Sequence, residues 1–497
     1  MATTEATSPA AAPPPVPSTG RDTAVDFVKA ACLIVVVGLH AMMAGFTVGA
    51  EGLTITNALD GHPIFAWSTW AVQVMPLFFL LGGFSSLTQW RRLRSAGVSA
   101  SDYVRMRITR LVRPAVLLFA LVGLTLAILA LTGLPADILR EVGFRIGQPL
   151  WFLAVYIGCA GLVPWMTALH ERAPRLTLAA LLLAAVAVDS VVAATGLELL
   201  GALNLLFVWV LIQQLGFAYA DGIIGVLPRW ALFVLAVAAF ALLLFLTTVF
   251  GYSTDMYENL NPPTVCILVL GVGQLMLFAT AHPWLRSLAD RPRVARVGLW
   301  VNANSMTIYL WHVPVIVLVV VVMLVSNLPF PEPLSLQWWQ TRPLFLVAIA
   351  VALVPIVMLV RQFDRSRHDD REVTMSPVLA VTKVLLGVAG VTVILLVGFS
   401  PAAGAALGVL LLALAVQLRG RRRRVVEPAN EAVREAVGEE VGEPGGEPVD
   451  EPAGEAAGEP AGEPAGEPAV PAEGSATHDS RAGRAPGEAP ATPPQKS

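Results

Sequence analysis

Long apolar stretches recur along the chain and are separated by short polar connections. Each stretch is close to the ~20 residues that an α-helix needs to cross the hydrocarbon core of a bilayer. The stretches lie at about residues 27–46, 66–87, 113–133, 149–168, 176–196, 201–218, 230–250, 263–282, 299–325, 342–360, 376–398 and 400–417. The pattern predicts an all-α fold, a polytopic transmembrane helix bundle of about twelve spans.

Arginine is concentrated in every second connection between these stretches. If the N-terminus is cytoplasmic, the connections on the cytoplasmic side hold Arg91, Arg92, Arg94, Arg105, Arg107, Arg110, Arg172, Arg175, Arg229, Arg286, Arg291, Arg293, Arg296, Arg365, Arg367, Arg371, Arg419 and Arg421 to Arg424. The external connections hold Arg140 and Arg145 and little else. Because cationic loops stay on the cytoplasmic side, this asymmetry predicts an integral protein of the cytoplasmic membrane with both termini inside.

The composition excludes an ordinary soluble protein, because 56% of the 497 residues are hydrophobic and only 14% are charged. The net charge of −3 conceals an acidic segment at residues 425–497, which holds 16 acidic and 4 basic residues. The three cysteines, Cys32, Cys159 and Cys266, lie in apolar runs and lack metal-ligand spacing. We therefore expect neither a disulfide framework nor a bound metal.

Two segments outside the apolar stretches are predicted to lack packed structure. Residues 1–20 are mostly Ala, Pro, Thr and Ser, and the residues after the four arginines at 421–424 repeat Gly-Glu-Pro with Ala. Neither composition buries enough apolar surface to offset the entropy of ordering. We expect a disordered N-terminal arm at 1–20 and, at 419–497, a basic stop followed by a disordered acidic cytoplasmic tail.

Ionisable residues inside the apolar stretches are costly and are therefore candidates for function. The first stretch carries Lys29 and His40, eleven residues apart. On an α-helix this spacing places the two residues on nearly one face, ~16 Å apart along the axis, so that both can line one cavity. Histidine is suited to accepting a proton near neutral pH. Two other roles are open for Lys29: its side chain could extend to the membrane interface, or it could pair with Asp26 one turn earlier.

A second basic group, Arg107, Arg110 and Arg113, lies at the cytoplasmic start of the third stretch. Spacing by three residues places the side chains on adjoining parts of one helical surface. Arginine suits phosphate because its planar guanidinium donates two parallel hydrogen bonds. Topology alone also explains these residues, because arginines are expected on the cytoplasmic side.

Amide and carboxylate side chains also occur inside the stretches. Asn204, Gln213 and Gln214 are expected mainly to join helices through hydrogen bonds. Asp189 fits either a packing role or a place on an access path.

Several motifs follow one another in a characteristic order. They are Asp26-Phe-Val-Lys29 with His40, Met75-Pro-Leu-Phe-Phe-Leu-Leu-Gly-Gly-Phe84, Arg107-x-x-Arg110, Pro149-Leu-Trp-Phe-Leu-Ala-Val-Tyr156, Asn204-Leu-Leu-Phe-Val-Trp209 with Gln214-Leu-Gly216 and Asp221-Gly222, and Tyr309-Leu-Trp-His312. In series they resemble the acyltransferase 3 family of integral-membrane acyltransferases over about residues 20–372. The first motif resembles the family's Arg/Lys-x10-His signature, and the third resembles its Arg-x-x-Arg pair.

The resemblance implies an enzyme that moves an acyl group from cytosolic acyl-CoA to a hydroxyl of an envelope glycan, lipid or secondary metabolite. Lys29, Arg107 and Arg110 would bind the CoA phosphates. His40 would deprotonate the acceptor hydroxyl or form an acyl-imidazole intermediate. Acyl-CoA is then a co-substrate, no cofactor stays bound, and the remaining partner is membrane lipid rather than nucleic acid.

The accessory residues have roles that the sequence leaves open. His312 would either assist His40 or make an interhelical hydrogen bond. Trp151, Tyr156 and Asn304 are candidates for stabilising the tetrahedral oxyanion. Asp26 is a further accessory candidate through its neighbour Lys29.

The chain departs from the family pattern in two ways. Lysine occupies position 29, where arginine is commoner, which preserves the charge but removes the bidentate fork. The last two apolar stretches lie beyond the family's usual ten spans. We therefore divide the chain into an arm at 1–20, an acyltransferase 3-like membrane domain at 21–372, two additional transmembrane helices at 373–418 and the tail at 419–497.

A multi-span secondary transporter is the main alternative, because many spans with a few buried ionisable residues are also typical of transporters. Against it, the sequence contains no clear internal repeat. A non-catalytic membrane sensor that kept the fold is a third interpretation, against which the presence of both Lys29 and His40 argues.

Overall fold

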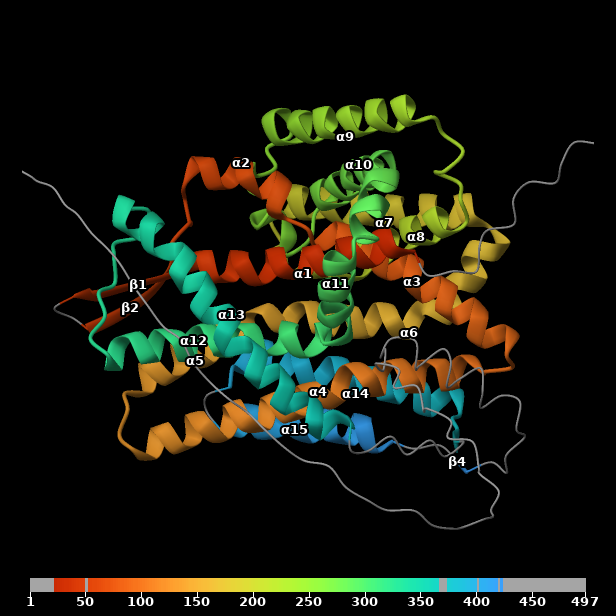
Figure 1. The fold of residues 1–497 in the computed structure, drawn as a ribbon. Helices are drawn as coiled ribbons and strands as arrows, with labels where there is room; N and C mark the ends of the chain where they lie inside the picture. The colour runs from red at the N-terminus through yellow and green to blue at the C-terminus, as the bar shows by residue number, and fades with distance from the viewer. Residues whose placement is uncertain (1–21, 50–51, 366–372, 400–401, 419–420, 423–497) are drawn as a thin grey trace, which may run out of the picture. The chain divides into compact units, whose positions relative to one another are not determined.

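The computed structural model describes residues 22–49, 52–365, 373–399, 402–418 and 421–422. The arm predicted at 1–20 and nearly all of the predicted tail lie outside the described residues. Within the described ranges the chain is mainly helical, and the long helices lie alongside one another (Figure 1). The all-α, many-span fold predicted from the sequence is confirmed.

Fifteen α-helices form the described part of the chain. They are α1 (Thr23–Met43), α2 (Pro63–Val72), α3 (Met75–Ser95), α4 (Ala100–Leu131), α5 (Ala136–Gly147), α6 (Trp151–Arg172), α7 (Pro174–Thr195), α8 (Asn204–Ala220), α9 (Arg229–Val249), α10 (Val265–Ala289), α11 (Pro292–Ala303), α12 (Ser305–Val325), α13 (Leu336–Arg365), α14 (Pro377–Val397) and α15 (Ala402–Gln417). Short 3-10 turns at Gln148–Leu150, Glu198–Leu203 and Glu258–Leu260 join some of them.

Two small antiparallel strand pairs complete the described structure. Strand β1 (Ala44–Gly49) continues directly from α1 and pairs with β2 (Gly52–Asn57), with Ala44 opposite Asn57 and Gly49 opposite Gly52. Strand β3 (Val373–Thr374) pairs with β4 (Arg421–Arg422). The sequence analysis did not predict the β1–β2 hairpin. It indicated only a short connection rich in glycine and threonine at this place.

Eleven helical segments in the described ranges are long and apolar enough to cross a membrane. Helix α15, the twelfth predicted span, has only 16 residues. At ~1.5 Å per residue it spans ~24 Å, less than the ~30 Å hydrocarbon core. Eleven of the predicted spans therefore correspond to full-length helices and one to a shorter helix.

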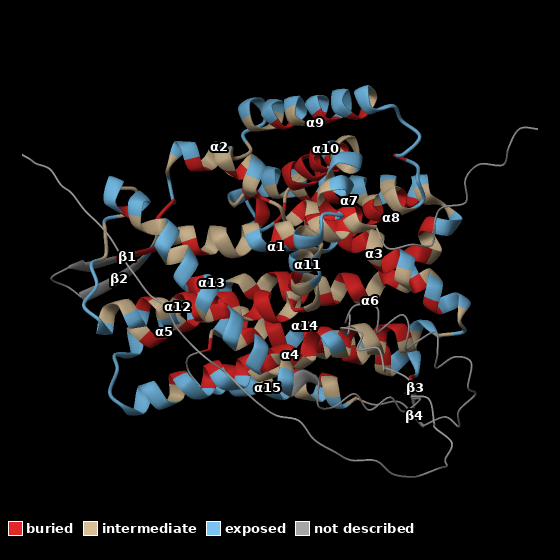
Figure 2. Cartoon of the chain, in the orientation of Figure 1, coloured by how far each residue is buried: buried red, intermediate tan, exposed pale blue. Residues whose placement is uncertain are grey.

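The outermost helices turn their large apolar side chains away from the protein. In α9 the buried residues are Leu232, Ala236, Ala239 and Leu243, a stripe three to four residues apart that faces α10. The rest of α9 is exposed or only partly buried, and Phe233 keeps 53% of its surface accessible (Figure 2). A helix that is apolar on every side but packs only one stripe is suited to a lipid environment.

The helix ends that carry most arginines lie together. Asp22, before α1, pairs with His282 near the end of α10, at 2.9 Å. Arg91 near the end of α3 pairs with Glu171 at the end of α6, at 3.1 Å. We call this the arginine-rich end, and the opposite end, which carries the β1–β2 strands, the hairpin end. The alternation of spans predicted from the arginine pattern is thus reproduced in the packing.

A break between α2 and α3 would leave backbone groups without partners inside the membrane, where such groups are costly. The Gln274 side chain of α10 fills this need. Its Oε1 accepts a hydrogen bond from the amide of Leu77 at 3.2 Å, and its Nε2 donates to the carbonyl of Gln73 at 2.8 Å. Pro76 in the first turn of α3 suits a helix start.

Helices α3 and α8 approach each other closely through glycines. A Cβ atom added to Gly216 would lie 2.0 Å from the carbonyl oxygen of Leu80, and one added to Gly83 would lie 2.4 Å from the carbonyl oxygen of Gln213. Small residues at such crossings allow backbones to pack together in a membrane, where lipid provides no hydrophobic driving force. This crossing fixes α3 relative to α8.

The two helices beyond the predicted ten-span unit pack against α4 and α6. A Cβ atom on Gly387 of α14 would lie 3.3 Å from Val112 of α4 and 3.4 Å from Ile157 of α6. Lys383, which is 1% exposed, donates from Nζ to the carbonyl of Ala415 at 2.6 Å and so caps the end of α15. The α14–α15 pair is therefore integrated with the helix that carries Arg107 and Arg110.

Replacing Gly216 with alanine tests the α3–α8 crossing. The new methyl group meets backbone atoms, which cannot rotate away, so Gly216→Ala should destabilise the fold by about 1–3 kcal/mol. Gly158→Ala on α6 is the matched control, because a Cβ there meets nothing within 4 Å. Thermal unfolding in detergent should show a lower midpoint for Gly216→Ala only. Equal midpoints for the two variants would show that the crossing is not tight.

Candidate active site

Two histidines from distant parts of the chain meet inside the protein. His40 lies near the end of α1 and His312 in the first half of α12. Their ring centroids are 4.9 Å apart, with the ring planes at 65°. The sequence identified both residues but did not predict that they are in contact.

Hydrogen bonds to backbone carbonyls determine which ring nitrogen of each histidine carries the proton. His40 Nδ1 lies 2.8 Å from the carbonyl oxygen of Val36, and His312 Nδ1 is hydrogen-bonded to the carbonyl of Tyr309. A carbonyl can only accept, so each Nδ1 is the donor and carries a hydrogen. In the neutral rings both Nε2 atoms are therefore bases.

The two histidines differ in their accessibility. His312 is 1% exposed, and among the described residues its buried Nε2 has no hydrogen-bond partner. His40 is only partly buried. The hydrogen bond of His312 stays within its own helix, and its contact with α1 is the ring of His40 rather than an interhelical hydrogen bond. His40 is thus the accessible member of the pair, with His312 behind it.

Lys29 lies on the same helix as His40 but faces α3. Its Nζ donates to the hydroxyl of Ser85 at 3.3 Å. One turn earlier, the carbonyl of Asp26 accepts a hydrogen bond from Nδ2 of Asn302 at 2.9 Å. The start of α1 is therefore fixed to both α3 and α11 around Lys29.

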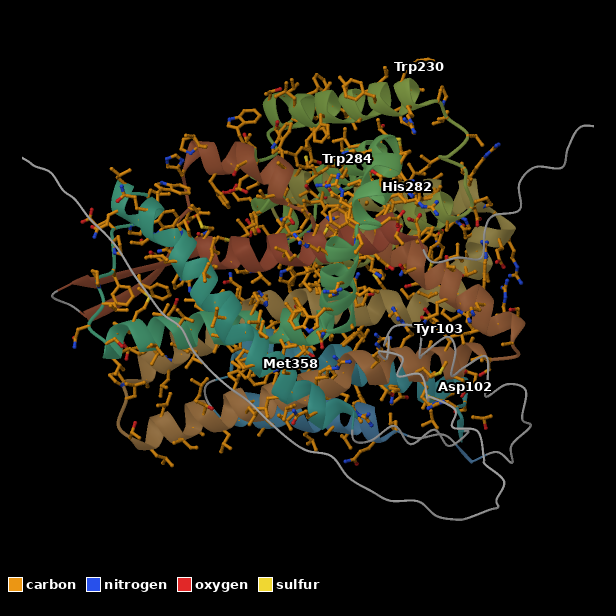
Figure 3. The ribbon with its side chains drawn as sticks, in the orientation of Figure 1. Asp102, Tyr103, Trp230, His282, Trp284 and Met358 are labelled. Carbon is orange, nitrogen blue, oxygen red and sulfur yellow. The ribbon has the colours of Figure 1, made fainter. Side chains whose placement is uncertain are left out.

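Arg107 and Arg110 lie on α4, where Arg107 is partly buried and Arg110 is exposed. Tyr103, one turn before Arg107, is fully buried and packs against Trp90 of α3, with the ring centroids 5.2 Å apart. Tyr103 and its neighbour Asp102 lie near the start of α4 (Figure 3). Arg107 is thus the member of the pair that approaches the interior.

A series of ring contacts leads from α6 to the histidine pair. Tyr156 stacks on Phe152 at 5.4 Å, Phe152 contacts Tyr309 at 4.9 Å, and Tyr309 lies 6.0 Å from His312, all measured between ring centroids. These contacts join α6 to His312 on α12 and, through His312, to His40 on α1. The sequence suggested Tyr156 as a site residue but did not indicate this series.

The remaining accessory candidates lie around the aromatic contacts. Trp151 is 5.8 Å from Trp209 and 6.4 Å from Phe152 between ring centroids. Asn304 is buried between α11 and α12 and donates from Nδ2 to the carbonyl of Trp300 at 2.7 Å. Trp151 therefore packs at the edge of the aromatic series. The amide group of Asn304 already donates one hydrogen bond to the backbone.

Asp189, which the sequence left between packing and access, has a full set of donors. It accepts hydrogen bonds from Asn204 Nδ2 at 2.7 Å, from the Tyr252 hydroxyl at 3.0 Å and from the amide of Val265 at 2.8 Å. A carboxylate with three donors joins the ends of α7, α8 and α10. Its contacts fit the packing interpretation.

A polar network that the sequence did not indicate joins α3, α6 and α8 at the arginine-rich end. The Nδ1 and Nε2 atoms of His170, which is 2% exposed, lie 2.9 Å from Oε1 of Gln214 and 3.1 Å from a carboxylate oxygen of Asp221. Arg91 pairs with the same Asp221 carboxylate.

The charges of this network control the titration of Asp221. Burial alone would raise the pKa of this carboxyl, but hydrogen bonds and charge from Arg91 and His170 hold the pKa below its usual value. The sequence analysis singled out Asp221 as part of the motif Asp221-Gly222. It did not single out His170, because this residue lies in no motif.

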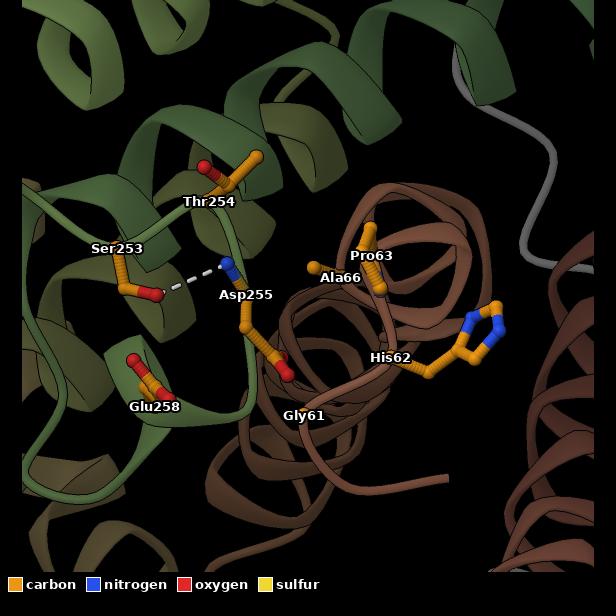
Figure 4. Close-up of a pocket in the computed structure, with 8 residues that line it drawn as sticks. All are labelled: Gly61, His62, Pro63, Ala66, Ser253, Thr254, Asp255 and Glu258. Atoms are coloured by element: carbon orange, nitrogen blue, oxygen red, sulfur yellow. Dashed lines mark hydrogen bonds between the residues drawn. The ribbon is translucent and has the colours of Figure 1, made fainter.

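A separate polar cavity of about 190 Å³ lies at the hairpin end, between the β2–α2 and α9–α10 connections (Figure 4). Asp255 and Glu258 line it together with Gly61 and Pro63. Burial, with Glu258 and Asp60 nearby, raises the pKa of Asp255. In the described ranges no cluster of three metal-ligating side chains is found here or elsewhere.

These observations define a polytopic helical membrane protein with a paired-imidazole site inside the helix bundle. The model of the acyltransferase 3 family, described as an acyltransferase domain, matches residues 22–361, and the chain belongs to this family. It is therefore a membrane acyltransferase. No curated protein and no solved structure matches the chain in the corresponding comparisons.

The Asp221 network generates a prediction about pH. Because the folded-state pKa of Asp221 is lowered, its contribution to stability is present above the unfolded pKa of ~3.9 and is lost as the pH falls below that value. Asp221→Asn should lower stability at pH 7 by about 1 kcal/mol and flatten the acid limb of the profile. Thermal unfolding midpoints measured from about pH 3 to pH 7 check this. Parallel profiles for wild type and variant would contradict it.

Proposed function

We propose that the protein transfers an acyl group from cytosolic acyl-CoA to the hydroxyl group of an envelope glycan, lipid or secondary metabolite. The observation that supports this function most directly is the His40–His312 contact at 4.9 Å. The aromatic contacts from Tyr309 to Phe152 and Tyr156 provide an apolar lining beside this pair. Family membership supports acyl transfer, and the paired imidazoles supply the base that it needs.

The donor would bind at the arginine-rich end. We assign this end, and both termini of the chain, to the cytoplasmic side of the plasma membrane. Lys29, Arg107 and Arg110 would bind the phosphates of CoA, because arginine and lysine are the side chains suited to phosphate. The pantetheine arm would follow the aromatic side chains of α6 and α12 toward His40. Aromatic and apolar walls suit such an arm, because they exclude water from the thioester.

At the reaction centre, Nε2 of His40 would remove the proton from the acceptor hydroxyl. The hydroxyl oxygen attacks the thioester carbonyl, a new C–O bond forms and the C–S bond then breaks. The thiolate of CoA takes the proton back from His40 and leaves as the thiol. The products are an ester and free CoA, and the enzyme returns to its starting state.

His312 would act as a neutral ring packed against the base. Burial without a carboxylate partner among the described residues disfavours an imidazolium, so the proton taken from the acceptor would stay on His40, the more accessible of the two rings. Trp151 and Tyr156, at the edge of the same aromatic contacts, are the candidates for donating to the oxyanion.

Replacing His40 tests the proposed base. His40→Ala should lower acyl transfer on the order of 10²–10⁴-fold, because the hydroxyl then lacks its proton acceptor. The measurement is transfer of label from radiolabelled acetyl-CoA to the lipid and polysaccharide fractions of membrane vesicles. Ile34→Ala on the same helix, at a side chain that is 56% exposed, is the matched control. Turnover by His40→Ala at the wild-type rate and equal expression would remove His40 from the mechanism.

The donor assignment is tested separately. Arg107→Gln and Lys29→Gln should each weaken acetyl-CoA binding by about tenfold, because each removes one charge-assisted contact with phosphate. Equilibrium binding of radiolabelled acetyl-CoA to the purified protein measures the effect. Arg175→Gln, an exposed arginine at the same end, should bind like wild type. Unchanged binding in the first two variants would show that the donor enters elsewhere.

A further inference from the structure

Arg342 joins the start of α13 to the end of α1, next to His40. Its Nη1 donates to the carbonyls of Ala41 and Ala44, both at 3.3 Å. Ala41 lies in the last turn of α1 and Ala44 directly follows the helix, where a helix end leaves acceptors without internal partners. The guanidinium therefore binds the chain at the residue after His40 and again one turn later, at the hairpin end and opposite to the proposed donor site.

Aromatic rings hold this guanidinium in place. Its central carbon lies 4.2 Å from the ring centroid of Trp338 and 4.8 Å from that of Phe345. Trp338 is itself fully buried and packs with Leu59 and Phe65. Cation–π contacts with fixed rings restrict the orientation of Arg342. The side chain is thus preorganised rather than free to move into solvent.

The remaining edge of the guanidinium lacks a counter-charge. Among the described residues, Nε and Nη2 of Arg342 have no hydrogen-bond acceptor, and no carboxylate pairs with the group. The other two arginines at this end differ, because Arg145 pairs with Glu141 at 2.6 Å and Arg140 donates to its own helix. Ionisable side chains within a membrane segment are rare and are candidates for function, and the edge of Arg342 that the chain leaves unpaired is the part available to a ligand.

We propose that Arg342 binds an anionic group of the acceptor, a carboxylate or a phosphate, and so positions the neighbouring hydroxyl at His40. The Nε and Nη2 atoms form the edge of a guanidinium that binds such anions through two parallel hydrogen bonds. Nη1 donates to the carbonyls of Ala41 and Ala44, and these hydrogen bonds fix the orientation of the Nε–Nη2 edge. The inference rests on the proposed function and narrows the acceptor to a molecule with an anion close to its reactive hydroxyl.

A matched pair of probes tests the charge preference without requiring turnover. Octyl β-D-glucuronide and its methyl ester present the same ring hydroxyls and differ in one negative charge. Equilibrium binding of radiolabelled forms is measured on the full chain in phosphatidylcholine nanodiscs, with empty discs subtracted. The wild type should bind the glucuronide about tenfold more tightly than the ester, the gain expected from one charge-assisted contact.

Three variants separate ligand binding from the support that Arg342 gives to α1. Arg342→Gln should abolish the preference while leaving binding of the ester unchanged. Arg342→Lys keeps a donor for α1 but lacks the fork, so it should retain ester binding and lose most of the preference. Arg140→Gln, at the same end, should behave like wild type. Equal loss of both probes in Arg342→Gln would show a structural role alone and overturn the proposal.

Further outcomes distinguish the source of the anion and the underlying function. Equal binding of the two probes to wild type overturns the proposal. If the preference disappears when phosphatidylglycerol is added to the discs, a lipid headgroup occupies the site and the assignment to the acceptor is wrong. Absence of acyl transfer to the glucuronide, with the Arg342-dependent preference intact, would count against the proposed function and not against the anion site.

Discussion

Within a bilayer, a polar group has no water to bind and must find its partner in the protein, and this constraint organises the whole molecule. Where α2 breaks, Gln274 supplies the missing hydrogen bonds. Where α7, α8 and α10 end, Asp189 collects three donors. Nε2 of His312 is one of several buried side-chain atoms without a partner among the described residues, and it is distinguished by lying in a ring that contacts a second imidazole.

In the proposed site, the groups that would bind the donor and the groups that would carry out the reaction lie at different positions along the helices. Cations on α1 and α4 lie at the arginine-rich end, and the imidazoles lie farther along α1 and on α12. The aromatic contacts beside the imidazoles combine apolar walls with ring edges, a lining that tolerates both an acyl chain and the amides of a pantetheine arm. In the proposed function, separating donor and acceptor sides in this way would let the reaction occur inside the protein, away from water on either side. The rigid α3–α8 crossing holds one side of this arrangement in place.

The periodicity of the sequence was sufficient to predict the helices, but it did not predict which helices contact one another. Apolar runs predicted the spans and placed Lys29 and His40 on one helix. The shared cavity inferred from their spacing of eleven residues stays a prediction, because Lys29 contacts α3 and His40 contacts α12. Contacts between distant segments leave no such periodic signal. For that reason the contact of His40 with His312, the contacts of His170 with Gln214 and Asp221, and the position of Arg342 could not be predicted. Arg342 was hidden further by its place at the start of an apolar run, where an arginine looks like an ordinary interfacial anchor.

The match to the family ends at residue 361, yet the packing continues beyond it. Gly387 of α14 fits against Val112 and Ile157, and Gly123 of α4 leaves space for Ala405 of α15. A boundary drawn from sequence similarity is thus not a mechanical boundary in this protein. The late helices form part of the wall against which α4 rests, so any displacement of them is transmitted to the helix that bears Arg107. If Arg107 binds the donor as proposed, substitutions in α14 and α15 would adjust that binding through residues outside the matched family unit.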